Sequence, residues 1–177
     1  MRIIDKTPPV TGQVSRRNFL ATGSAAAAVI ISGTAIICPV EAWGYEVKAL
    51  KPETMRTLLK LARDIYPHDR LSEKFYAVAM KGYDDAGQKA DVEAFAAKLD
   101  AGAKKAGGSA YADEPWEAKR VAVLRELESD PFFQKVRGGL VTGLYNNPEI
   151  WPMFGYEGES ASKGGYINRG FGDIAWL

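Results

Sequence analysis

Residue types that commonly do chemistry are scarce in this sequence. The single histidine, His68, lies in the run Tyr66-Pro67-His68-Asp69, directly after a stretch with helical periodicity. A histidine near a carboxylate is a common pair for general acid–base catalysis, so His68 with Asp64 or Asp69 is the arrangement that would point to an enzyme. No motif directs a serine, a cysteine or a second histidine toward it. A loop histidine hydrogen-bonded to the backbone is therefore the favoured interpretation.

The counts of cysteine and histidine exclude several classes of site. With one cysteine, Cys38, the chain cannot form an internal disulfide, bind haem through C-x-x-C-H or hold an iron–sulfur cluster by cysteine ligands. With one histidine it cannot build a multi-histidine metal site. The glycine-rich motifs that bind dinucleotides or phosphates are missing as well. We therefore predict no catalytic residue, no cofactor-binding residue and no metal ligand in this chain.

One pair of adjacent carboxylates, Asp84 and Asp85, follows the second predicted helix. Adjacent residues at a helix end face different ways, which disfavours a shared metal ion or a shared proton. We expect both carboxylates to lie on a solvated helix terminus. The net charge of +1, from 23 basic and 22 acidic residues, likewise disfavours a nucleic-acid partner.

The first 42 residues have the features of a bacterial export signal. The run Ser15-Arg16-Arg17-Asn18-Phe19-Leu20 matches the twin-arginine (Tat) motif, and an apolar run follows from Ala21 to Cys38. Val40 and Ala42 occupy the small-residue positions of a signal peptidase site. The predicted signal residues are Ser15, Arg16, Arg17, Phe19 and Leu20, with cleavage after Ala42.

Two alternatives for this segment stay open. An uncleaved anchor is one, although the 18 residues from Ala21 to Cys38 fall short of the span length, which is about 20 residues. A lipoprotein modified at Cys38 is the other, although Ile37 stands where a small residue is required. The Tat route exports folded proteins. Since no cofactor motif is present, a Tat signal here indicates that a cofactor belongs to a companion exported with this chain.

Residues 43–144 predict an all-α domain, a small bundle of about five helices. Apolar residues at helical spacing, with capping residues before them, predict helices that begin near Lys51, Ser72, Ala90, Asp113 and Asp130. Val78 and Trp116 are counted on the apolar faces of the second and fourth helices. No convincing alternation of period two is found, so no strand is expected.

The C-terminal segment, residues 145–177, has a different character, with six glycines, seven aromatic residues and no periodicity. Disordered tails are poor in aromatic residues, so these rings must be buried, either on the chain's own bundle or on a partner. Aromatic and arginine side chains dominate interface hot spots. The predicted partner-interface residues are Trp151, Phe154, Tyr156, Tyr166, Arg169, Phe171 and Trp176.

Several of these runs, in this order behind a Tat signal, resemble the gluconate 2-dehydrogenase subunit 3 family. The runs are Leu61-Ala62-Arg63-Asp64-Ile65-Tyr66-Pro67-His68-Asp69, Phe132-Phe133, Gly143-Leu144-Tyr145-Asn146-Asn147-Pro148-Glu149, Phe154-Gly155-Tyr156-Glu157-Gly158 and Gly164-Gly165-Tyr166. Members of this family are the small (gamma) subunits of periplasmic flavoprotein dehydrogenases. None of the runs is a catalytic motif.

The resemblance implies a non-catalytic accessory subunit. In such complexes a large subunit of the glucose–methanol–choline (GMC) oxidoreductase family carries FAD and oxidises an alcohol or a sugar. A multihaem cytochrome c often accepts the electrons. The small subunit stabilises the large one, and its Tat signal brings both to the Tat translocase. This implies a periplasmic location, with membrane contact only through the signal or a partner that holds the complex at the inner membrane. The alternative from the residues alone is a self-standing Tat-exported enzyme that uses His68 and a nearby carboxylate.

Overall fold

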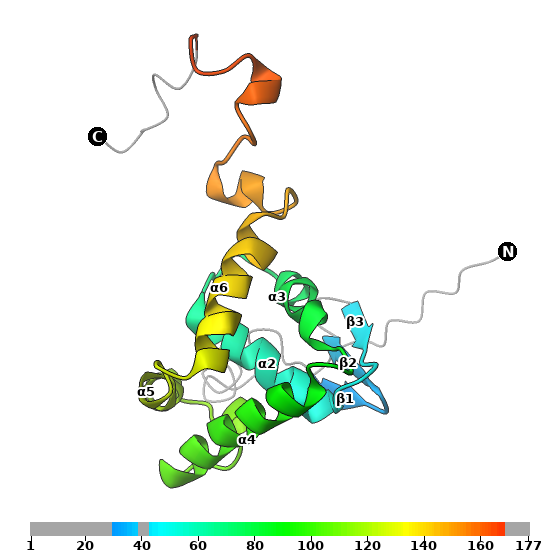
Figure 1. Ribbon diagram of the computed structural model, residues 1–177, viewed down its shortest axis with the longest axis vertical. Helices are drawn as coiled ribbons and strands as arrows, with labels where there is room; N and C mark the ends of the chain where they lie inside the picture. The colour runs from blue at the N-terminus through cyan, green and yellow to red at the C-terminus, as the bar shows by residue number, and fades with distance from the viewer. Residues whose placement is uncertain (1–29, 39–42, 169–177) are drawn as a thin grey trace, which may run out of the picture.

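The computed structural model describes residues 30–38 and 43–168, which form a helical bundle with a small sheet at one side (Figure 1). The α-helices are α2 (Pro52–Ile65), α3 (Glu73–Met80), α4 (Lys89–Lys105), α5 (Glu117–Glu126) and α6 (Pro131–Tyr145). The short 3-10 helices are η1 (Lys81–Tyr83), η2 (Tyr111–Asp113), η3 (Trp151–Phe154) and η4 (Ala161–Lys163). The mainly helical architecture and the five predicted helices are confirmed.

The small sheet corrects the prediction of an all-α domain. Strands β1 (Ile30–Ser32), β2 (Ala35–Cys38) and β3 (Trp43–Glu46) pair antiparallel in the order β1-β2-β3. A two-residue turn joins β1 to β2, and its Gly33 has a φ of +60°, which glycine adopts without strain. No strand was expected because no period-two alternation stands out in the sequence; the three strands are only three or four residues long, and β1 and β2 lie in the run predicted to be the apolar part of the export signal.

Two helices, α3 and α6, begin at the residues predicted to cap them. Ser72 Oγ accepts a hydrogen bond from the Lys74 N–H at 3.2 Å, and Asp130 Oδ1 accepts one from the Phe132 N–H at 2.8 Å. Both contacts satisfy a backbone donor that the first helical turn leaves open. The expected cap at Asp113 is wrong: that residue ends η2 and pairs with Arg56, and α5 begins at Glu117.

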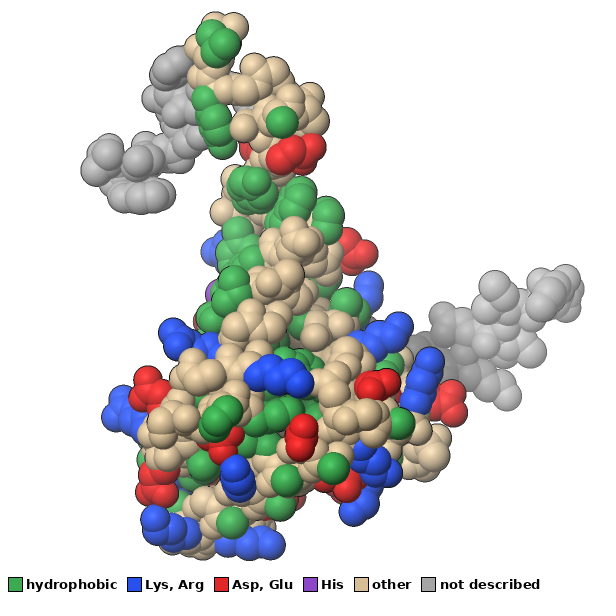
Figure 2. All heavy atoms as spheres, viewed as in Figure 1, with side chains coloured by type: hydrophobic (Ala, Val, Ile, Leu, Met, Phe, Trp, Pro, Cys, Tyr) green, Lys and Arg blue, Asp and Glu red, His purple; other side chains and the backbone are tan. Residues whose placement is uncertain are grey.

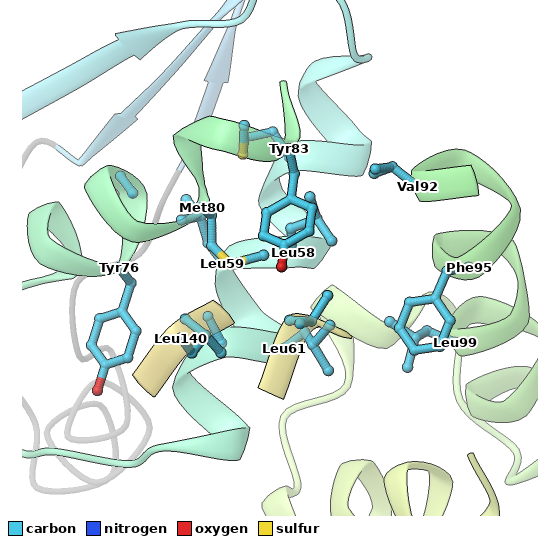
Figure 3. Packing of buried hydrophobic residues seen from close by; sticks show 14 of the residues in the cluster. Leu58, Leu59, Leu61, Tyr76, Met80, Tyr83, Val92, Phe95, Leu99 and Leu140 are labelled. Atoms are coloured by element: carbon cyan, nitrogen blue, oxygen red, sulfur yellow. The ribbon is translucent and has the colours of Figure 1, made fainter. Parts of the chain in front are cut away.

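The core lies around α2, against which the other helices pack. Figure 3 shows side chains of several elements converging there, with Leu58 and Leu61 in the middle of the group. The predicted apolar faces of α4 and α6 are buried, at Val92, Phe95, Ala96, Leu99, Ala103, Phe133, Val136, Leu140 and Leu144. The faces predicted for α3 and α5 are wrong at one position each, since Val78 is 52% exposed and Trp116 is 69% exposed.

The carboxylate of Asp84 connects the sheet to the bundle through hydrogen bonds. It accepts hydrogen bonds from Tyr45 Oη at 2.7 Å and from the N–H groups of Lys48, Ala49 and Leu50 at 2.8, 2.8 and 2.9 Å. Burial by itself would raise the pKa of Asp84, but these hydrogen bonds outweigh it and hold the pKa below its usual value. The expected solvated carboxylate is therefore wrong for Asp84, while Asp85 beside it is exposed.

Candidate partner interface

The C-terminal segment leaves the bundle at the end of α6 and extends away from it (orange to red in Figure 1). Five of the eight exposed large hydrophobic side chains among the described residues fall on this segment, at Met153, Phe154, Tyr156, Tyr166 and Ile167. Figure 2 shows hydrophobic side chains along this projection beside a few acidic ones, whereas most basic and acidic side chains lie on the bundle. The segment therefore combines apolar chemistry with access to solvent.

The base of the segment is fixed to α6. Ile150 is fully buried in the core, and Trp151 Nε1 donates a hydrogen bond to the Tyr145 carbonyl at 2.8 Å. The Trp151 and Tyr156 rings meet edge to face with centroids 5.2 Å apart, and the Tyr156 N–H donates to the Trp151 carbonyl. The sequence left open whether this segment packs on its own bundle or on a partner. Its base packs on the bundle, and its outer part is uncovered.

One glycine is required for the fold of this base. Gly158 has a φ of +95°, and a Cβ atom there would lie 3.3 Å from Cζ3 of Trp151. Both the backbone conformation and the close ring therefore favour glycine at this position. The turn directs the chain from η3 past the indole and on toward η4.

The same side chains border a shallow pocket on the segment. Its volume is about 430 Å³, and its lining residues are Pro148, Trp151, Pro152, Gly155, Tyr156, Glu157 and Lys163. Two aromatic rings and two prolines make most of this surface apolar, and one acidic and one basic residue complete its lining. Such a surface suits an apolar or aromatic side chain of a protein partner.

His68 lies at the foot of the C-terminal segment. Its Nε2 is 2.6 Å from Tyr145 Oη, and its ring meets the Phe154 ring edge to face at 5.0 Å. Burial, and then the positive charge of Arg63, lower the pKa of His68, while Asp69 acts in the opposite direction. His68 therefore joins the 66–69 corner to both α6 and η3.

Arg63 holds the corner in which His68 lies. Its guanidinium donates to the carbonyls of His68 at 2.6 Å and Leu71 at 2.9 Å, and pairs with Glu73 at 2.8 Å. Tyr76 Oη donates to the Tyr66 carbonyl. The run from Leu61 to Asp69 thus ends α2 and begins the corner to α3, in which the carbonyls of Tyr66 and His68 accept side-chain hydrogen bonds.

Asp64 and Asp69, the two carboxylates that a His68-dependent enzyme could use, lie in different environments. Asp64 accepts hydrogen bonds from Arg120 Nε at 2.7 Å and Nη2 at 2.9 Å, and from Tyr111 Oη at 2.8 Å. The side chains of this ion pair are nearly fully buried, so Asp64 is committed to holding α2 against α5 and η2. Asp69 is exposed and acts on His68 through its charge.

The structure describes four of the seven predicted interface residues. Trp151 is half-buried, whereas Phe154, Tyr156 and Tyr166 are exposed. The interface residues Arg169, Phe171 and Trp176, the signal residues Ser15, Arg16, Arg17, Phe19 and Leu20, and the cleavage residue Ala42 lie outside the described residues. Sequence reasoning missed Met153 and Ile167, which are apolar and exposed but not aromatic.

The described residues hold neither a metal-binding cluster nor a helix that could span a membrane. No group of three or more histidine, cysteine, aspartate or glutamate side chains in this part of the chain could hold a metal ion. No helix within residues 30–38 and 43–168 combines the length and apolar character that a membrane span requires. Comparisons with protein-family models, with curated proteins and with solved structures found no match.

Proposed function

We propose that this chain is the non-catalytic small subunit of a periplasmic FAD-dependent dehydrogenase that oxidises an alcohol or a sugar. The chain stabilises a GMC-type flavoprotein, and its twin-arginine signal exports the two together. Arg16 and Arg17, with Phe19 and Leu20 behind them, engage the Tat translocase. FAD belongs to the large subunit, and a cytochrome c subunit is the candidate electron acceptor.

The observation that carries this proposal is the concentration of exposed apolar side chains on the C-terminal segment. Exposed apolar patches of this kind mark sites where proteins bind one another. The base of the segment is fixed by Ile150 and Trp151, so the outer side chains are presented from a defined position. A fixed base also reduces the conformational entropy lost on binding.

The contacts of His68 support an accessory rather than a catalytic role. Its Nε2 is hydrogen-bonded to Tyr145, and Asp64 is engaged by Arg120 and Tyr111. We therefore assign His68 to fixing the C-terminal segment. The resemblance described above suggests the partner, and the exposed apolar side chains support docking of that partner on the C-terminal segment.

The test is recovery of the tagged chain from its native periplasm, with an absorbance spectrum of the eluate. We expect a large partner in equal amount and the bands of oxidised flavin. A single chain without a chromophore would contradict the proposal.

Variants of the segment test where the partner binds. Tyr166→Ala together with Ile167→Ala removes two exposed side chains that make no core contact. We expect about 30-fold weaker binding of the flavoprotein, corresponding to hot-spot losses near 2 kcal/mol. The matched control is Trp116→Ala, which removes an exposed tryptophan from the bundle and leaves binding unchanged. A loss seen only in the control would place the interface on α5 instead.

A further inference from the structure

The strands β1 and β2 form part of the folded core although they lie in the predicted export signal. Ile36 and Cys38 are fully buried, and Ile36 packs in the same hydrophobic cluster as Leu50 and Leu58. Between them, Ile37 points to the other side of the sheet and is half-buried. Alternation of this kind is expected of a strand with one face against a core.

Cleavage after Ala42 would remove two of the three strands. Strand β2 pairs with β3 at all four positions, from Ala35 opposite Glu46 to Cys38 opposite Trp43. The Val47 N–H donates to the Thr34 carbonyl at 3.0 Å, and this bond would be lost as well. The remaining strand β3 would then be an unpaired edge beside the space left by Ile36, and such edges favour aggregation.

Contacts with the bundle hold β3 in the position at which β2 pairs with it. Asp84, which follows α3 and η1 in the sequence, accepts hydrogen bonds from the Tyr45 hydroxyl and from the N–H groups of residues 48–50. These contacts keep β3 and the start of α2 together. The hairpin of residues 30–38 therefore adds to an edge that the bundle already fixes.

We propose that the exported protein keeps residues 30–38, because its leader ends at the alanine run Ala25–Ala28 instead of at Ala42. This inference rests on the proposed export by the Tat route. Ala26 and Ala28 supply the small residues that signal peptidase requires, ahead of Val29. Hydrolysis of the Ala28–Val29 peptide bond consumes one water and leaves a carboxylate on Ala28 and an amino group on Val29. The segment from Phe19 to Ala25 serves as the apolar part of the leader, and the sheet stays intact.

The first test is the N-terminal residue and intact mass of the protein purified from the periplasm. A chain that begins between Ala26 and Val29 supports the proposal. A chain that begins at Trp43 overturns it, and so does an uncut chain that begins at Met1. If the protein is never found in the periplasm, the proposed export fails, which is a result distinct from any of these.

The second test uses adjacent isoleucines in the full-length gene. Ile36→Ala and Ile37→Ala remove the same atoms from the same stretch, so any effect on the leader itself is matched. Because Ile36 is fully buried and Ile37 is not, we expect the purified protein to melt lower by about 5–15 °C for Ile36→Ala and by clearly less for Ile37→Ala. Melting temperatures equal to that of the unchanged protein for both variants would overturn the proposal. This test works on protein from either compartment, so it separates the packing of residues 30–38 from export.

Discussion

At the scale of single residues, His68 makes contacts that join three parts of the fold. The imidazole is hydrogen-bonded to Tyr145 and lies against Phe154, so it joins α6, the 66–69 corner and η3. Burial and the nearby Arg63 guanidinium hold its pKa below the ordinary value of 6.5. The same residue is the chain's single histidine, which makes its titration separable from that of other groups.

This lowered pKa predicts a dependence of stability on pH. Because the folded chain binds the His68 proton more weakly than the unfolded chain does, the stabilisation is complete above the unfolded pKa of 6.5 and falls as pH drops through that value toward the folded pKa. We expect the melting temperature to fall between about pH 7.5 and about pH 5.5, and to fall less in His68→Gln. Glutamine retains a nitrogen that can donate to Tyr145 but does not titrate. Equal falls in the two proteins would contradict this role for His68.

At the scale of the elements, the carboxylate of Asp84 positions the start of α2 against β3. Three successive backbone N–H groups, of Lys48, Ala49 and Leu50, point to this one carboxylate. It also hydrogen-bonds the Tyr45 hydroxyl; burial, and then this bond, raise the pKa of Tyr45 to about 12. The contact joins segments more than thirty residues apart in the sequence.

Replacing this carboxylate tests its contribution to the fold. Asp84→Ala leaves four donors without their acceptor, so we expect a loss of about 3 kcal/mol in the free energy of unfolding, seen as a melting temperature lower by roughly 10 °C. The matched control is Asp85→Ala. Asp85 is exposed and accepts one hydrogen bond, from the Gly87 N–H, and we expect a loss of less than about 1 kcal/mol there. Similar losses in the two variants would show that Asp84 does not fix the sheet.

At the scale of the whole molecule, the chain consists of a folded body with a projecting apolar segment, and its N-terminal residues include the run that matches a twin-arginine motif. The proposed accessory role requires these parts to act on a companion. The body gives the C-terminal segment a fixed base through Ile150 and Trp151. In the proposed role, the signal determines where the companion is delivered.

Exchange of both arginines of the motif tests that dependence. With Arg16→Lys and Arg17→Lys together, we expect the companion flavoprotein to stay in the cytoplasm and periplasmic dehydrogenase activity to fall to background. Arg2→Lys is the matched control, since it makes the same exchange outside the motif. Normal periplasmic activity in the double variant would contradict export of the flavoprotein by this chain.

The sequence by itself determined the five helices and four of their five starts. Apolar spacing located all five, because a helix that packs on a core must repeat its buried positions every three to four residues. Ser72 and Asp130 marked two starts, because capping depends on residues only two positions away. The sequence also predicted that the C-terminal segment is irregular and rich in aromatic residues, and the structure finds short 3-10 turns there.

Only the tertiary structure decided the contacts that join distant segments. The hairpin of residues 30–38 has a short apolar pattern that a leader shares, and only the structure shows its pairing with β3. The buried pair of Asp64 and Arg120 and the four hydrogen bonds to Asp84 join residues that are far apart in the chain. Local periodicity shows which face of an element is buried. It does not show which other element covers that face, because the partner is chosen by packing of the whole chain.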